Sequence, residues 1–164
     1  EEQGRPAVKM QVIEGAHVVV WVDALADPTA DPQAIPGSAA VVTGSPAARA
    51  DIATWVLALQ ASLGDRAMVA VVAAGATGAR FAVEDFVAAG AVIDALAEVG
   101  IDYTSPEAAA AAGAWAALRN AGSHVLSASV AGQELLATGG SLDAARDAWS
   151  APGIRVVREF GGTL

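Results

Sequence analysis

The sequence of 164 residues contains no cysteine, a single lysine and few charged residues of either sign. The lack of cysteine excludes disulfides, thiolate metal sites and a cysteine nucleophile. Lys9 and the arginines are scattered and the net charge is −9, so we expect no binding to the phosphate backbone of nucleic acids. No apolar run approaches the roughly 20 residues of a membrane span, so we also expect no membrane partner.

The chain has a surplus of apolar residues, much of it alanine. Hydrophobic residues make up 54% of the sequence and charged residues 16%, whereas about a quarter of the residues of a typical globular protein are charged. Such a surplus suits helices packed tightly on a sheet and a buried interface between copies, so we expect a homo-oligomer, at least a dimer. Residues 1–6 lack the basic and apolar regions of a signal peptide, so we expect a cytoplasmic protein. The length suits a single domain over residues 1–164.

Strand-like and helix-like segments alternate along the chain. Continuous apolar runs predict strands at residues 18–22, 39–43, 68–73 and 154–157, and the short run 125–127 is compatible with another. Capping residues and apolar periodicity predict helices at residues 46–63, 82–100, 106–120, 130–137 and 142–149. The proline-rich residues 26–37 predict an irregular connection. This order predicts an α/β fold, a three-layer α/β/α arrangement with a mostly parallel sheet, in which 18–22 and 68–73 are inner strands.

Acidic residues stand where an α/β fold places a ligand, at the carboxyl ends of its strands. Asp23 closes the strand 18–22, and Glu84 and Asp85 lie in the first turn of the helix after the strand 68–73. We expect these carboxylates to converge on one cleft, where they suit a hard cation. The expected rim of the cleft is the loop with Gly75, Gly78 and Arg80. Alternatively, Asp23 caps a turn, and the two helix-start acids only stabilise the helix dipole.

A second candidate site lies where two predicted elements meet, at residues 127–132. Ser127, Ser129 and the backbone N–H of Gly132 are groups that can hold an anion at a helix start. Plain helix capping explains the same serines equally well. If the cleft binds anions only, Glu84 and Asp85 should point away from it and these three residues should face the ligand.

The order of the motifs resembles the 2-phosphosulpholactate phosphatase family, the ComB-like proteins. The segment AAGATGARFAVEDFVAAGAVIDAL is similar to a family segment with a small-residue loop, an aromatic or leucine, Glu-Asp and Ala-Gly. The strand VVVWVDAL resembles the family's apolar strand and Asp-Val-Leu motif, and LSASVAGQELLATGG resembles its Ser-Gly-x-Glu-Leu region. The resemblance extends from about residue 15 to residue 160.

The resemblance implies an Mg²⁺-dependent phosphatase that acts on 2-phosphosulpholactate or a similar small anionic phosphomonoester. For such a reaction, the candidate catalytic and metal-binding residues are Asp23, Glu84 and Asp85, and the candidate substrate-binding residues are Gly75, Gly78, Arg80, Ser127, Ser129 and Gly132. The sequence also departs from the family. Asp23 is followed by Ala-Leu-Ala rather than by an arginine and a Ser/Thr pair, and residues 26–37 replace a longer middle segment. The alternative is therefore an inactive ComB-like relative that binds small anions or has a structural role.

Overall fold

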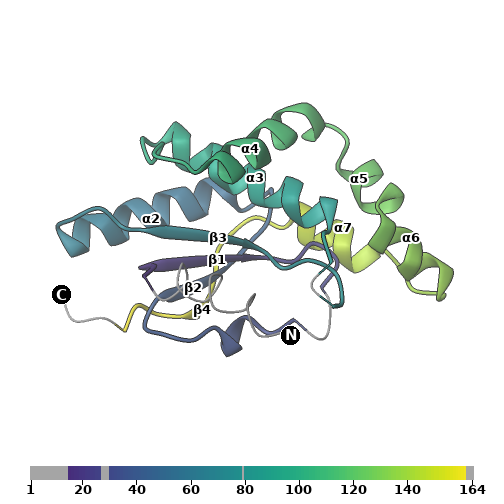
Figure 1. The fold of residues 1–164 in the computed structure, drawn as a ribbon, viewed down its shortest axis with the longest axis horizontal. Helices are drawn as coiled ribbons and strands as arrows, with labels where there is room; N and C mark the ends of the chain where they lie inside the picture. Colours follow the sequence, from purple (N-terminus) through teal and green to yellow (C-terminus); the bar gives the residue numbers. More distant parts are fainter. Residues whose placement is uncertain (1–14, 27–29, 79, 162–164) are drawn as a thin grey trace, which may run out of the picture.

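A four-stranded sheet forms the centre of the structure, a computed structural model that describes residues 15–26, 30–78 and 80–161. The strand order is β3-β1-β2-β4. The strands are β1 (Val18–Val22), β2 (Ala40–Gly44), β3 (Val69–Ala73) and β4 (Arg155–Arg158). β1 is parallel to both β2 and β3, and β4 is antiparallel to β2 (Figure 1). The α/β fold with a mostly parallel sheet is therefore confirmed.

β1 is the inner strand that its continuous apolar run predicts. Val18, Val19, Val20 and Val22 have no exposed surface, because parallel neighbours flank the strand and apolar groups cover both of its faces. In the register of the sheet, Val20 lies between Val42 of β2 and Val71 of β3. The carboxyl ends of β1 and β3 consequently lie side by side.

The prediction that 68–73 is an inner strand was wrong. β3 lies at an edge of the described sheet, and its residues are half-buried except for Ala73, which is exposed. Val69 and Val71 pack toward one face of the sheet, and Ala70 and Val72 toward the other. An apolar run reports that both faces of a strand are covered, and it does not report whether strands pair with both of its edges.

Helices cover one face of the sheet. α2 (Arg49–Leu63) and α3 (Val83–Glu98) pack on the even-numbered residues of β1, and Ile52, Val56 and Val92 are among their core contacts (Figure 1). α2 ends at Gly64, which takes the left-handed conformation of a helix end. The predicted start at residue 46 was too early: α2 begins at Arg49 after a turn in which Ser45 accepts a hydrogen bond from the N–H of Ala48.

The opposite face is covered, among the described residues, by the connection between β1 and β2. It contains a single 3-10 turn, η1 (Pro32–Ala34), so the expectation of no regular structure there was wrong for these three residues; residues 27–29 lie outside the described part. Asp31 caps the turn by accepting from the N–H of Gln33. Ile35 packs under the sheet, and Arg158 of β4 holds the connection by donating to the carbonyl oxygens of Ala39 and Ile35 at 3.0 and 2.7 Å.

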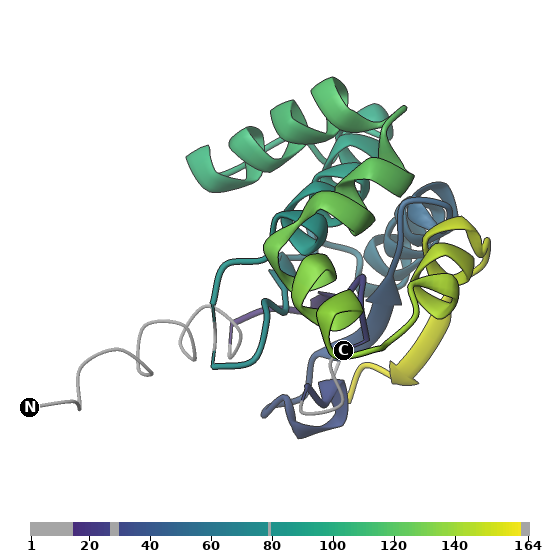
Figure 2. The ribbon, with the colours of Figure 1, turned by 90° about the vertical axis from the view of Figure 1, so that its right-hand side faces the viewer.

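Four further helices continue from the far side of α3 to the carboxyl ends of β1 and β3. They are α4 (Pro106–Leu118), α5 (Gly122–Ala128), α6 (Val130–Ala137) and α7 (Asp143–Ser150), and Figure 2 looks onto this end of the molecule. A strand at 125–127 was therefore a wrong prediction: these residues lie in α5, where Val125 and Leu126 are buried and Val125 packs against residues of α3 and α4. A three-residue apolar run cannot distinguish a strand from one turn of a buried helix. No described helix has both the length and the apolar character needed to cross a bilayer.

α3 and α4 approach each other closely at Gly90. A Cβ atom at this position would lie 2.0 Å from the carbonyl oxygen of Ala111. Only a glycine permits this contact, and it fixes how α3 lies between α4 and the sheet.

Candidate functional site

A pocket of about 340 Å³ opens at the carboxyl ends of β1 and β3. Four segments line it: the residues after β1, the loop after β3, the first turn of α3 and one side of α6. The lining residues are Asp23, Leu25, Ala26, Gly75, Ala76, Thr77, Arg80, Ala82, Glu84, Asp85, Ala131, Glu134, Leu135 and Thr138. The structure thus brings five of the sequence-predicted site residues to one pocket: Asp23, Gly75, Arg80, Glu84 and Asp85. Their chemical roles stay predictions.

Asp85 connects the two strand ends. Its Oδ1 accepts a hydrogen bond from the N–H of Ala24 at 2.7 Å, and its Oδ2 accepts one from the N–H of Gly75 at 2.8 Å. The side chain is 2% exposed. The carboxylate therefore fixes the position of both loops, and the amide of Gly75, which the sequence offered for phosphate, is already used.

Burial raises the pKa of Asp85 from 3.8 to about 6, because the ionised form loses its hydration. This value already includes two smaller influences: the hydrogen bonds from Ala24 and Gly75 lower the pKa, and the negative charges of Asp23 and Glu84 raise it. A carboxyl group with this pKa gains or loses its proton close to neutral pH, which is common at functional sites.

Glu84 carries a buried oxygen without a protein partner. The residue is 1% exposed, and its Oε2 atom makes no hydrogen bond to any of the described residues. A buried carboxylate oxygen without a donor is costly unless a ligand supplies the missing interaction. Glu84 also lines the pocket, so its carboxylate is a candidate ligand for a cation bound there.

The carboxylates do not form a ready-made metal cage. No group of three or more His, Cys, Asp or Glu side chains is placed to hold a metal ion within residues 15–26, 30–78 and 80–161. Mg²⁺ does not need such a cage, because it is commonly held by one or two carboxylates together with water and substrate phosphate. The unpartnered oxygen of Glu84 and the raised pKa of Asp85 fit a site of that open kind.

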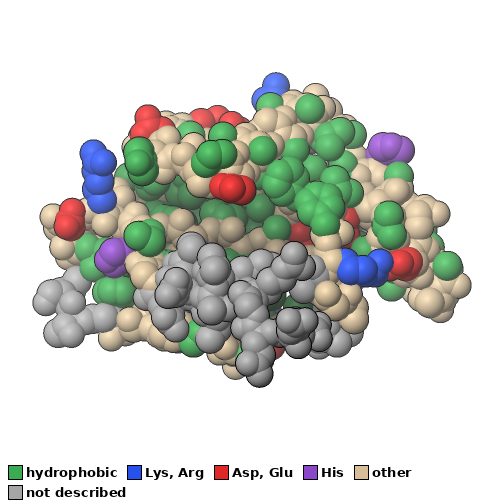
Figure 3. All heavy atoms as spheres, in the orientation of Figure 1, with side chains coloured by type: hydrophobic (Ala, Val, Ile, Leu, Met, Phe, Trp, Pro, Cys, Tyr) green, Lys and Arg blue, Asp and Glu red, His purple; other side chains and the backbone are tan. Residues whose placement is uncertain are grey.

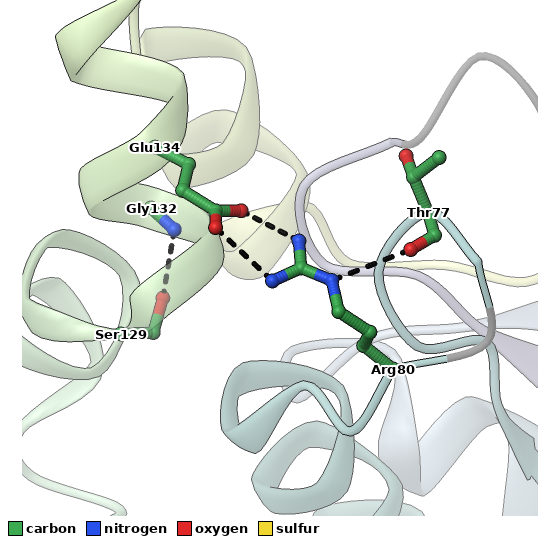
Figure 4. Close-up of polar contacts among 5 residues, drawn as sticks. All are labelled: Thr77, Arg80, Ser129, Gly132 and Glu134. Atoms are coloured by element: carbon green, nitrogen blue, oxygen red, sulfur yellow. Dashed lines mark hydrogen bonds and ion pairs between the residues drawn. The ribbon is translucent and has the colours of Figure 1, made fainter.

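Arg80 and Glu134 form an ion pair across the pocket between the loop after β3 and α6. Nη1 and Nη2 of Arg80 donate to Oε1 and Oε2 of Glu134 at 3.0 and 2.6 Å, and Nε donates to the carbonyl oxygen of Thr77 at 3.4 Å (Figure 4). The pair raises the pKa of Arg80 and lowers that of Glu134, through the hydrogen bonds and the opposite charges. Sequence reasoning did not single out Glu134. Its signal was the glutamate of the segment GQEL, within the region that resembles Ser-Gly-x-Glu-Leu.

The second candidate site is a capping structure instead. Ser129 is the N-cap of α6, and its Oγ accepts from the N–H of Gly132 at 3.0 Å (Figure 4). Ser127 donates to the carbonyl oxygen of His124 at 3.5 Å. Ser127, Ser129, Gly132 and Gly78 are not among the residues that line the pocket. The structure does not have the arrangement expected of an anion-only cleft, because Glu84 and Asp85 line the pocket and the two serines do not.

Comparison with protein families decides the relationship. The sequence model of 2-phosphosulpholactate phosphatase matches residues 29–146, which is more than half of the chain. The chain belongs to the 2-phosphosulpholactate phosphatase family. The matched range of this family member includes Arg80, Glu84, Asp85 and Glu134, whereas Asp23 lies before it. Comparisons with curated proteins and with solved structures found no match.

Proposed function

We propose that this protein is a magnesium-dependent phosphatase that hydrolyses 2-phosphosulpholactate or a similar small phosphomonoester. Membership of the family supports the reaction class. The observation that carries the proposal is the pair of buried carboxylates in the first turn of α3. Both residues line the pocket, and Oε2 of Glu84 has no hydrogen-bond partner among the described residues. Burying two neighbouring carboxylates costs free energy, and a bound cation would offset that cost.

In this proposal Glu84 and Asp85 hold Mg²⁺, with Asp23 close enough to share the task. When bound, the ion would neutralise phosphate charge and orient the water and the phosphoryl group. Asp85 is largely ionised above its pKa of about 6, and its two backbone hydrogen bonds keep the carboxylate in one orientation. Arg80 binds the phosphoryl or sulfonate oxygens through its guanidinium fork. Water attacks phosphorus, the P–O bond to the alcohol breaks, and the alcohol takes up a proton.

The test measures phosphate release from a panel of small phosphomonoesters, with Mg²⁺ or with a chelator, and Mg²⁺ binding by calorimetry. We expect Mg²⁺-dependent release by the wild type and its loss in Asp23→Asn, Glu84→Gln and Asp85→Asn. Glu98→Gln is the matched control, since it removes one exposed carboxylate at the far end of α3. Wild-type binding and turnover in all three variants would contradict the mechanism.

The second candidate function is an inactive family member that binds small anions. Two observations favour it: the arginine and Ser/Thr pair after Asp23 are absent, and Arg80 is already paired with Glu134. Under this alternative the wild type releases no phosphate from any substrate of the panel and binds no Mg²⁺.

A homo-oligomer is a separate proposal, based on the apolar composition. Several large hydrophobic side chains are exposed, and Figure 3 shows green side chains gathered on one face of the molecule. The exposed set is Leu57, Met68, Phe81, Tyr103, Val130 and Leu136. Light scattering at micromolar concentration tests this proposal, and a monomer mass would refute it.

A further inference from the structure

The ion pair of Arg80 and Glu134 has the geometry of an arginine bound to an anionic ligand. Two guanidinium N–H groups meet the two oxygens of one carboxylate at 3.0 and 2.6 Å. The same fork matches two oxygens of a phosphoryl or sulfonate group. Glu134 therefore occupies the place on Arg80 that an anionic ligand of this pocket would take.

The position of Arg80 does not depend on Glu134. The backbone of Arg80 is tied to Ala76 by two hydrogen bonds, N–H to O at 3.0 Å in one direction and 3.1 Å in the other. Nε of Arg80 also donates to the carbonyl oxygen of Thr77 (Figure 4). The loop thus presents the guanidinium to the pocket whether or not the carboxylate is there.

The carboxylate of Glu134 is easy to exchange. The side chains of Arg80 and Glu134 are 50% and 53% exposed, and ion pairs at such positions contribute little to stability because water and salt compete with them. When Glu134 leaves Arg80, its charge remains hydrated. By contrast, Glu84 and Asp85 are buried and have no such alternative.

The charges of the pocket make this exchange necessary for an anion. Arg80 is the only cationic side chain among the lining residues that the structure describes, and four carboxylates line the pocket with it. While Glu134 neutralises Arg80, an incoming anion meets the negative field of the other three. An anion that takes over the guanidinium fork acquires the one positive charge.

We propose that Glu134 is an internal competitor for Arg80: it holds the guanidinium in the ligand-free protein, and the anionic group of the substrate replaces it on binding. Glu134 is then a positioning residue that sets the affinity of the pocket for anions. The inference rests on the proposed function only in taking a phosphoryl or sulfonate group as the ligand.

The experiment measures the affinity of inorganic phosphate for the full chain by calorimetry, with methanesulfonate as a second probe. Glu134→Gln keeps the shape of the side chain and removes the competing charge, so we expect binding to become roughly two- to fivefold tighter, as when a competing state is removed. Arg80→Ala should bind neither probe measurably, and Glu134→Gln should add nothing in the Arg80→Ala background. Glu98→Gln, which removes one exposed charge away from the pocket, should match the wild type.

The two proposals fail in different ways. If the wild type releases no phosphate from esters, the phosphatase proposal fails, while the tighter phosphate binding of Glu134→Gln still supports the competitor. If the protein is a phosphatase, Glu134→Gln should lower KM and leave kcat unchanged, and Arg80→Lys should recover part of the affinity lost in Arg80→Ala. Equal or weaker phosphate binding by Glu134→Gln, or no phosphate binding by either protein, overturns the inference.

Discussion

Glu84 and Asp85, the buried carboxylate pair, and Arg80 and Glu134, the exposed ion pair, line the same pocket but are held in opposite ways. The buried pair is at most 2% exposed, and Asp85 is held by backbone N–H groups of two loops. The exposed pair is about half exposed, and an ion pair at the surface joins its two side chains. The charges of Glu84 and Asp85 are therefore costly to bury and fixed in place, whereas those of Arg80 and Glu134 are hydrated and can exchange partners. The two pairs should respond differently to pH, to substitution and to salt.

The largest expected effect is the pH dependence of stability that Asp85 causes. The ordinary pKa of an aspartate is 3.8 and that of Asp85 in the folded protein is about 6, so between these values the folded state holds a proton that the unfolded state has lost. The free energy of unfolding should therefore fall as the pH rises from about 4 to 6, by roughly 3 kcal/mol, and stay level above pH 7.

Urea denaturation of the wild type and of Asp85→Asn over pH 4–8 measures this contribution as the difference between the two curves. The variant removes the titrating group, so the other carboxyl groups cancel in the comparison. A difference that does not change with pH would show that burial does not penalise the charge of Asp85, and the contrast between the two pairs would disappear.

A smaller effect is expected at Glu84. In Mg²⁺-free buffer, Glu84→Gln should raise the free energy of unfolding by about 1 kcal/mol, because it removes the negative charge from a buried side chain whose Oε2 has no hydrogen-bond donor among the described residues. Added Mg²⁺ should stabilise the wild type and leave the variant unchanged, as expected for a ligand that binds only the folded state. Thermal unfolding with and without the ion tests both statements, with Glu98→Gln as the control. A clear loss of stability in Mg²⁺-free buffer would indicate that Glu84 has a structural role instead.

The smallest effect is expected at the exposed ion pair. Arg80→Ala and Glu134→Gln should leave the urea midpoint within error of the wild type, because the pair lies in water at the surface. Arg146→Ala offers a matched control, since Arg146 pairs with Asp143 at 3.2 Å on the surface of α7. A marked destabilisation by Arg80→Ala but not by Arg146→Ala would make the Arg80 pair a structural clamp between the loop and α6.

Local signals predicted the parts of the fold that depend on local physics. β1 follows from five consecutive apolar residues. α4 follows from Ser105 and Pro106: Ser105 caps the helix by accepting a hydrogen bond from the N–H of Ala108, and Pro106 is its first residue. The edge position of β3 and the helical state of residues 125–127 did not follow, because each depends on which other element packs against the segment.

The same division holds for the site. Asp23, Glu84 and Asp85 were found because parallel strands end side by side, so residues that follow them meet. Glu134 was not found, because it comes from a helix that only the tertiary fold brings to the pocket. The prediction of an anion site at Ser127 and Ser129 went wrong for a local reason, because helix capping and anion binding use the same groups. Here the hydroxyl of Ser129 already accepts a hydrogen bond from the N–H of Gly132.

The contact between Gly90 and Ala111 fixes the position of α3 at a point outside the pocket, so a change there would alter the direction of the helix. Glu84 and Asp85 lie six and five residues from Gly90, which at the rise of a helix is a distance of roughly 8–9 Å. A side chain at position 90 would push against the carbonyl oxygen of Ala111 and tilt the helix, and the tilt would move the carboxylate of Asp85 away from the N–H groups of Ala24 and Gly75. The alignment of the acidic groups thus depends on the absence of a side chain at Gly90, a residue that does not line the pocket.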